Sequence, residues 1–251
     1  MTIVAMFHLS HYRTFKDFYL YCLRAEYDIE FPKLVSYDRF IELMPMTFMP
    51  LVLLLHSLSG KQTGKYYIDS CKLPVCHNLR IYRNKVFKNV AKRGKVSTGW
   101  FFGFKRHIVI NDHGELMSFA LTPGNVDDRS VVQHLVSKLR GWLFGDRGYI
   151  SKKLCDSLLA QGLELITKVK SNMKEKILEP IKAQFLNYRG IIETINDQLK
   201  NLCQIEHTRH RSVMNFQVNI LSGLLAYVFK PNKVSVPFNK LNNLIPFLMP
   251  N

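Results

Sequence analysis

The sequence predicts an α/β fold, a mixed sheet flanked by helices, preceded by a small helical N-terminal domain. Three observations support this prediction. Residues 1–62 carry apolar side chains at helical spacing, a series of β-rich runs begins near residue 65, and strand-like and helix-like segments then alternate. With 251 residues, of which 47% are hydrophobic, the chain is long enough to build a packed core.

The N-terminal region contains two informative segments. "YRTFKDFYLYCLRAEY" places Phe15, Phe18, Tyr19 and Cys22 at spacings of three and four, which predicts one apolar helical stripe. The most apolar window, "LMPMTFMPLVLLL" at 43–55, is shorter than the roughly 20 residues of a membrane span and contains two prolines. We therefore interpret it as a core helix with proline breaks, and we expect no membrane partner.

In the rest of the chain, apolar patterns typical of strands alternate with patterns typical of helices. Predicted strands cover 65–69, about 101–110, 116–121, 141–145 and 163–169. The turn signal "NDHG" at 111–114 predicts a hairpin between the second and third strands. Predicted helices cover roughly 129–140, 151–161, 189–203 and 213–229. The tail after Pro231 is rich in Asn, Lys and Pro, and we expect a poorly ordered extension there.

The charge balance points to a polyanionic partner. There are 35 Lys and Arg residues against 19 Asp and Glu residues, which gives a net charge of +16 and a pI near 9.7. This excess is typical of proteins that neutralise nucleic-acid phosphates, although ribosomal and membrane-surface proteins share it. The five cysteines are an odd number without disulfide-framework spacing, which indicates a reducing cytoplasm. Cys71, Cys76 and His77 could suggest zinc, but unpaired thiols fit their spacing better.

Three acids stand at positions that suggest a shared site. Asp69 and Asp146 each follow an apolar, aromatic run, and we expect each to end a strand. In "YRGIIETINDQLK", Arg189, Glu193 and Lys200 project from nearly one helical face. Taken singly, the aspartates could be turn or helix caps and the helix could carry a solvated ion-pair stripe. Together, carboxylates on rigid elements favour a site for Mg²⁺ ions that serves phosphoryl transfer.

Two basic segments are candidate DNA contacts. "RNKVFKNVAKRGK" at 83–95 fits a mobile DNA-contacting loop or a merely solvated one. Its candidate residues are Lys85, Lys88, Lys92, Arg93 and Lys95. "EHTRHRS" supplies His207, Arg209, His210 and Arg211, as a phosphate-contacting cluster or as a solvated helix end. Asp127 and Asp128 could support the site from behind or cap the helix that starts there.

Several blocks of the sequence resemble one family. "YYIDSCKLPVCHNLRI", "GWFFGFKRHIVIN", "GNVDDRS", "GDRGYISK", "RGIIETINDQLK" and "EHTRHRS" are similar, in order and spacing, to bacterial DDE transposases of insertion sequences, in the family numbered nine-eighty-two. The resemblance runs from about residue 4 to residue 228. It implies a ribonuclease-H-like core in residues 63–230, a DNA-end-binding helical domain in residues 1–62 and a C-terminal tail in residues 231–251.

The resemblance also implies roles for individual residues. Asp69, Asp146 and Glu193 would form the metal-binding triad for two Mg²⁺ ions, with Mn²⁺ as a substitute. Arg189 and Lys200 match two further positions of the family signature and would neutralise phosphates. The tyrosine of that signature would stand at position 186, where this chain has Leu186. The implied activity is cleavage of DNA at the element ends, followed by strand transfer into target DNA.

The implied partners are double-stranded DNA, both terminal inverted repeats and target, and a second copy of the chain, since two ends must be held together. The location would be the cytoplasm, at the nucleoid. A ribonuclease-H-like nuclease with a host role, or an impaired DNA-binding remnant, are the alternatives. Because relatives carry further helical residues upstream, we also expect weakened end-specific binding, unless this is a natural short variant.

Overall fold

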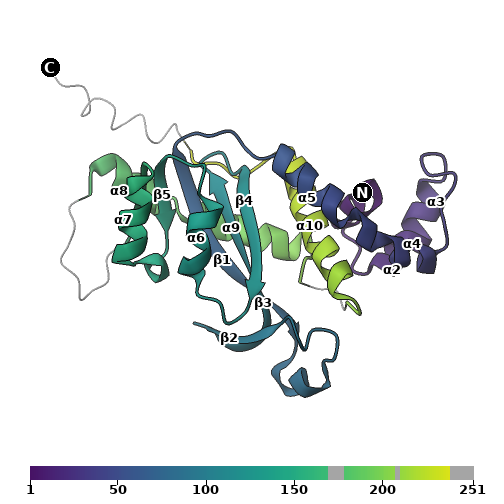
Figure 1. The fold of residues 1–251 in the computed structure, drawn as a ribbon. Helices are drawn as coiled ribbons and strands as arrows, with labels where there is room; N and C mark the ends of the chain where they lie inside the picture. Colours follow the sequence, from purple (N-terminus) through teal and green to yellow (C-terminus); the bar gives the residue numbers. More distant parts are fainter. Residues whose placement is uncertain (169–177, 207–209, 238–251) are drawn as a thin grey trace.

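A six-stranded mixed sheet with helices on both faces forms the centre of the molecule, and a helical N-terminal region lies at one end (Figure 1). The computed structural model describes residues 1–168, 178–206 and 210–237. The strands are β1 (Lys65–Cys76), β2 (Lys92–Val96), β3 (Gly99–Asn111), β4 (Leu116–Pro123), β5 (Gly141–Gly145) and β6 (Leu163–Thr167). The predicted fold class is confirmed.

The sheet has an antiparallel half and a parallel half. Its order is β2-β3-β1-β5-β6, and β4 pairs with β3 beside β2. β3 runs antiparallel to β1, β2 and β4, and the "NDHG" turn joins β3 to β4 as predicted. β5 is parallel to both β1 and β6. Because helices cover both faces, every residue from Phe101 to Asn111 is buried, as expected for a central strand.

Two sets of helices cover the sheet. The apolar face of α6 (Asp128–Leu135) and α7 (Lys152–Ala160) packs on one side with Tyr66 and Ile68 of β1. On the other side, Tyr67 and Leu73 of β1 belong to the core that includes α8 (Pro180–Asn187), α9 (Gly190–Asn201) and α10 (Val213–Phe229). Successive β1 side chains therefore enter different cores, as the strand period requires.

The N-terminal helices pack on the end of this second core. They are α1 (Thr2–Leu9), α2 (Phe15–Asp17), the π-helical η1 (Phe18–Leu23), α3 (Arg24–Glu26), α4 (Tyr37–Leu43), the 3₁₀ turn η2 (Met44–Thr47) and α5 (Phe48–Ser57). Phe18, Tyr19 and Cys22 of the predicted stripe are buried with Phe7. Helices α1 and α5 contact α10, which is buried almost throughout. The domain boundary at residue 62 stays a prediction.

The prolines at 45 and 50 do not break the helical run, contrary to expectation. Pro45 lies in the 3₁₀ turn η2 and Pro50 in the first turn of α5, so the type of helix changes near the prolines while the run continues. Residues Tyr37–Ser57 consequently form one run of 21 residues, which by length and composition alone could cross a membrane. Leu51 and Leu55 face the core. That no membrane is involved stays a prediction.

Four elements differ from those predicted. β1 extends to Cys76 instead of ending at residue 69, because the long strand β3 continues to pair with it. β2 forms within the basic segment that was expected to be a loop, because the start of β3 provides a partner there. Helix α8 was not predicted, and α6 ends earlier than expected at Leu135.

The close packing of β1 on β3 can be tested at one glycine. A Cβ at Gly103 would lie 2.0 Å from the carbonyl oxygen of Leu73, so Gly103→Ala must push the two strands apart. We expect it to lower the free energy of unfolding by about 1–3 kcal/mol in urea titrations. At Gly190, the first residue of α9, an added methyl group would meet no atom within 4 Å, so Gly190→Ala should be neutral or slightly stabilising. Equal effects would contradict this packing.

Candidate active site

The parallel pairing of β5 with β1 brings two of the predicted acids together. The last paired residues are Tyr67 and Phe144, and Asp69 and Asp146 each follow two residues later. Both acids therefore extend from the sheet face that carries the α8 and α9 core. Asp146 directly follows β5, as predicted, and its Oδ1 accepts a hydrogen bond of 2.8 Å from the backbone N–H of Arg147.

Asp69 does not end its strand, contrary to the prediction. It pairs with Ile108 inside β1, and the strand continues for seven more residues, from Ser70 to Cys76. A strand end was expected because a carboxylate inside a buried strand lowers stability unless another group compensates its charge. The local cause of its tolerance is that β5 has already ended at Gly145, which opens the sheet beside Asp69.

A carboxamide on α9 holds Asp69. Asn196 is 8% exposed; its Nδ2 donates a hydrogen bond of 2.9 Å to Asp69 Oδ2, and its Oδ1 accepts one of 2.8 Å from Arg106 Nη2. Arg106 is fully buried on β3, and its Nε and Nη1 have no hydrogen-bond partner within the described ranges. Sequence reasoning missed both residues, although Asn196 follows Glu193 by three positions and so shares its helical face.

The electrostatics around Asp69 show that the predicted acids converge. Burial raises the pKa of Asp69 to about 6. A hydrogen bond to the backbone of Ser70 and the charge of Arg189 oppose this rise, while the charges of Glu193 and Asp146 add to it. Asp69 is therefore a desolvated carboxylate with two acidic neighbours, which is a common arrangement at catalytic sites.

Glu193 is held by its own helix in this conformation. It lies in the first turn of α9, its side chain is 59% exposed, and it makes an ion pair with Arg189, whose side chain is 20% exposed. This is the i, i+4 pair expected from the sequence. Lys200 is at the other end of α9, where its Nζ lies 3.3 Å from Glu206 Oε2. The structure thus brings Arg189 to the acids and places Lys200 farther along β1, near Cys71.

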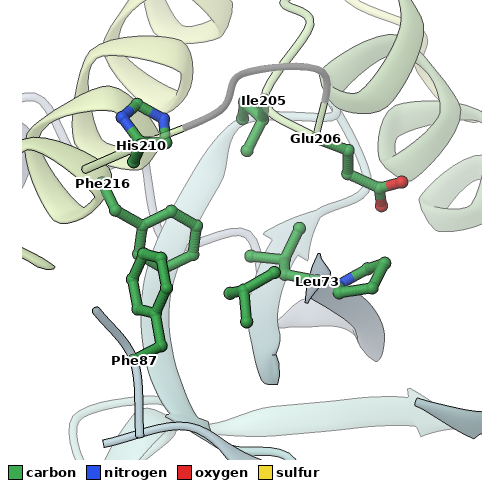
Figure 2. Close-up of a pocket in the computed structure, with 8 residues that line it drawn as sticks. Leu73, Phe87, Ile205, Glu206, His210 and Phe216 are labelled. Carbon is green, nitrogen blue, oxygen red and sulfur yellow. The ribbon is translucent and has the colours of Figure 1, made fainter. Parts of the chain in front are cut away.

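A small cavity lies against the second half of β1, at Leu73, Pro74 and Val75 (Figure 2). Phe87, Phe216 and His210 line one side, and Glu206 lies on another. Its volume of about 20 Å³ is enough for about one water molecule. It is too small for a nucleotide, and it is separate from the three acids.

The predicted basic contacts differ in their surroundings. Lys85, Lys88, Lys92, Arg93 and Lys95 are all exposed, and the last three belong to β2 instead of the expected loop. Arg211 is exposed. Burial lowers the pKa of His210 to about 4, so this side chain is neutral at pH 7 and adds no positive charge. His207 and Arg209 lie outside the described residues.

The paired aspartates before α6 have two different roles. Asp127 caps the helix, since its Oδ1 accepts a hydrogen bond of 2.9 Å from the backbone N–H of Arg129. Asp128 accepts hydrogen bonds of 2.8 Å from both Ser70 Oγ and Lys105 Nζ. Ser70 faces the opposite side of β1 from Asp69, so Asp128 fixes the strand directly behind the acid.

Comparison with known proteins adds the deciding observation. Residues 59–213, which include all three acids, match the model of the transposase DDE domain. The chain belongs to the transposase DDE domain family. No curated protein matches it. Among solved structures, a simian T-cell lymphotropic virus intasome in complex with PP2A regulatory subunit B56 gamma is similar with 12% identity and a TM-score of 0.36. The similarity covers 77% of this chain and 63% of that one.

The mixed sheet and its flanking helices fit the ribonuclease-H-like architecture of a DDE domain. Members of this family generally use divalent metal ions, so the acids of this site should be able to hold one. Within the described residues no three His, Cys, Asp or Glu side chains are already arranged around a metal position. Asp69 and Asp146 nevertheless supply two oxygen donors, and Mg²⁺ in proteins commonly takes one or two carboxylates and keeps several waters. Glu193 would be the third donor, and its Oε1 is paired with Arg189 in this conformation.

The raised pKa of Asp69 in this DDE domain gives a pH-dependent prediction. Its folded-state pKa lies above the unfolded value, so the folded protein binds the extra proton and loses stability as pH rises from about 4 to about 6. Asp69→Asn should remove this loss. In metal-free buffer at pH 7.5 the variant should be more stable than the wild type, by up to about 3 kcal/mol, and the difference should vanish near pH 4. Denaturant titrations across this range measure it; a constant difference would show that Asp69 is not desolvated.

Proposed function

We propose that this DDE domain is the catalytic part of an insertion-sequence transposase, of the bacterial family numbered nine-eighty-two, that cleaves DNA at the element ends and transfers them into target DNA. The observation that carries the proposal is the meeting of Asp69 and Asp146 at one opening of the sheet, with Glu193 and Arg189 within electrostatic reach. The family match over residues 59–213 supports the same reaction class.

In this proposal Asp69, Asp146 and Glu193 bind two Mg²⁺ ions, for which Mn²⁺ can substitute. Bound there, the ions would activate a nucleophile and stabilise the leaving oxygen in phosphoryl transfer. Asn196 orients Asp69 through its 2.9 Å hydrogen bond, and buried Arg106 fixes Asn196 from behind. The protein thereby holds the first carboxylate in one rotamer before any ion arrives, which lowers the cost of assembling the site.

Arg189 acts as an exchangeable partner in the proposed mechanism. Its ion pair with Glu193 satisfies both charges in the free protein. When a DNA phosphate enters, Arg189 can pair with the phosphate and release Glu193 toward the other acids. DNA binding and completion of the acidic triad would then be one coupled event, which keeps the free enzyme from cutting at random.

The charge distribution supports DNA as the partner. The net charge is +16, and the basic residues of β2 and of the segment before it are exposed to solvent, where phosphates can reach them. We further propose that residues 1–62 bind element ends, that two copies act together because two ends must be joined, and that the protein acts in the bacterial cytoplasm at the nucleoid.

A second candidate function is a DNA-binding remnant without cleavage activity. The ion pair between Glu193 and Arg189 favours it, because the described residues hold no complete metal group without a rearrangement. A host nuclease with the same fold would differ from the transposase in needing no particular end sequence.

The test uses labelled duplexes that carry the inverted repeats flanking the gene, compared with scrambled duplexes. With Mg²⁺ or Mn²⁺ the wild type should cut at the repeat ends more than in the scrambled duplexes, whereas the larger Ca²⁺ should permit binding with little cleavage. Asp146→Asn should abolish cleavage and keep DNA binding. Asp197→Asn is the matched control, because Asp197 is an exposed acid on α9 that bonds only Asn201 among the described residues.

Each outcome separates the candidates. Cleavage by Asp146→Asn at the wild-type level would refute the assignment of the acids. Wild-type protein that binds DNA and cuts neither duplex with any ion would favour the remnant. Equal cutting of repeat and scrambled duplexes would favour the nuclease.

A further inference from the structure

An exposed tryptophan stands at the start of the otherwise buried strand β3. Trp100 is 54% exposed, while every residue from Phe101 to Asn111 is buried. Two cations lie over its ring: Arg93 Cζ is 5.6 Å and Lys95 Nζ is 5.7 Å from the ring centroid. Single exposed apolar residues are common, so the two cations at the ring, and not its exposure alone, distinguish this position.

The ribbon of β2 and β3 fixes this arrangement. Lys95 pairs directly with Trp100, and Arg93 lies diagonally across from it, so the three side chains share one face of the ribbon. The Nδ2 of Asn78 donates a hydrogen bond of 2.8 Å to the carbonyl oxygen of Trp100. Behind the ribbon, a Cβ at Gly94 would lie 2.1 Å from the carbonyl oxygen of Gly124, so the two backbones are in contact. The ring is therefore presented by a braced scaffold.

The ring borders an open hollow of about 420 Å³. The β4–α6 connection, from Gly124 to Arg129, also lines it, and so does Gly148, two residues after Asp146. The hollow therefore reaches the segment that carries one of the proposed catalytic acids. Figure 1 shows β2 and the start of β3 extending from the sheet beyond the end of α6.

The charges in the hollow leave a net positive potential. Asp127 is paired with Arg129 at 2.5 Å, and Asp128 is paired with Lys105 at 2.8 Å, so both carboxylates are neutralised. Arg93 and Lys95 make no ion pair within the described part of the chain and keep their charge for a ligand. A partner with negative charge beside a flat ring matches this surface, and nucleotides have both features.

We propose that the hollow binds an unpaired nucleotide of the DNA substrate, with its base stacked on Trp100 and its phosphates on Arg93 and Lys95. This inference rests on the proposed function, which makes DNA the substrate. An indole can stack on a base only where the base is not already stacked and paired in a duplex. Single-stranded or frayed DNA next to the cleaved end is therefore the preferred ligand, and intact duplex is not.

Intrinsic fluorescence tests the stacking directly, because the chain has only two tryptophans, Trp100 and Trp142. Trp142 lies on β5, and its ring centroid is 6.2 Å from that of Phe185. Trp142→Phe removes this second indole, so Trp100 becomes the single tryptophan reporter. Titration of an oligothymidine of about 12 nucleotides should quench this emission by stacking. A blunt duplex of equal length should leave the emission nearly unchanged at the same salt concentration.

Affinity measurements with Trp100→Ala give the second readout. Base stacking contributes about 1–3 kcal/mol, so oligothymidine affinity should fall about 5- to 100-fold, and blunt-duplex affinity should stay within about twofold. Tyr82→Ala is the matched control, because Tyr82 is a 99% exposed ring outside the hollow and its loss should change neither affinity.

Several results would overturn the inference. The first is an absence of fluorescence quenching in the Trp142→Phe chain, and the second is an equal loss of oligothymidine affinity in Trp100→Ala and Tyr82→Ala. The third is a change of sedimenting mass in Trp100→Ala while its oligothymidine affinity stays the same. The last would identify a protein contact instead. The quenching result does not depend on whether Trp100→Ala folds. If the wild-type protein does not cleave DNA but its oligothymidine binding depends on Trp100, the proposed catalysis is refuted and the inference about Trp100 stands.

Discussion

The register of β5 against β1 is the constraint on which the site depends. The two strands run parallel through Tyr67 and Phe144 and then separate, because β5 ends at Gly145 while β1 continues along β3. A shift of one residue would turn either aspartate to the opposite face of the sheet. This register places Asp69 and Asp146 at one opening, and α9 then brings Glu193, Arg189 and Asn196 over it.

The energetic cost of this arrangement falls on Asp69. Its desolvation and its two acidic neighbours raise the pKa to about 6, and the Ser70 backbone and the charge of Arg189 oppose this rise. Buried Arg106 is held in turn by Asn196, with two nitrogens that lack partners in the described ranges. Such under-compensated polar groups are typical of sites that gain stability when a charged ligand binds. A dication at this opening would supply the missing positive charge.

The sequence predicted the parts of the site that depend on local patterns. Asp146 was placed correctly because β5 is a short apolar run, and the Arg189 and Glu193 pair because both lie on one helical face. The extent of β1 could not be predicted, since its second half is paired only because β3 is long. β2 was not predicted, because its Lys and Arg residues occur in edge strands as well as in loops. Asn196 shares the helical face of Glu193, but its role could not be predicted because it depends on a long-range contact to Asp69.

The most direct test of this account is the number of protons released when Mn²⁺ binds. Calorimetric titration in two buffers with different ionisation enthalpies measures that number. With a pKa of about 6, Asp69 should release about half a proton per bound site at pH 6 and almost none at pH 8, and Asp69→Asn should release none at either pH. Equal proton release by the wild type and the variant at pH 6, or binding unaffected by the substitution, would contradict the claim that the partly buried carboxylate of Asp69 is the core of a metal site.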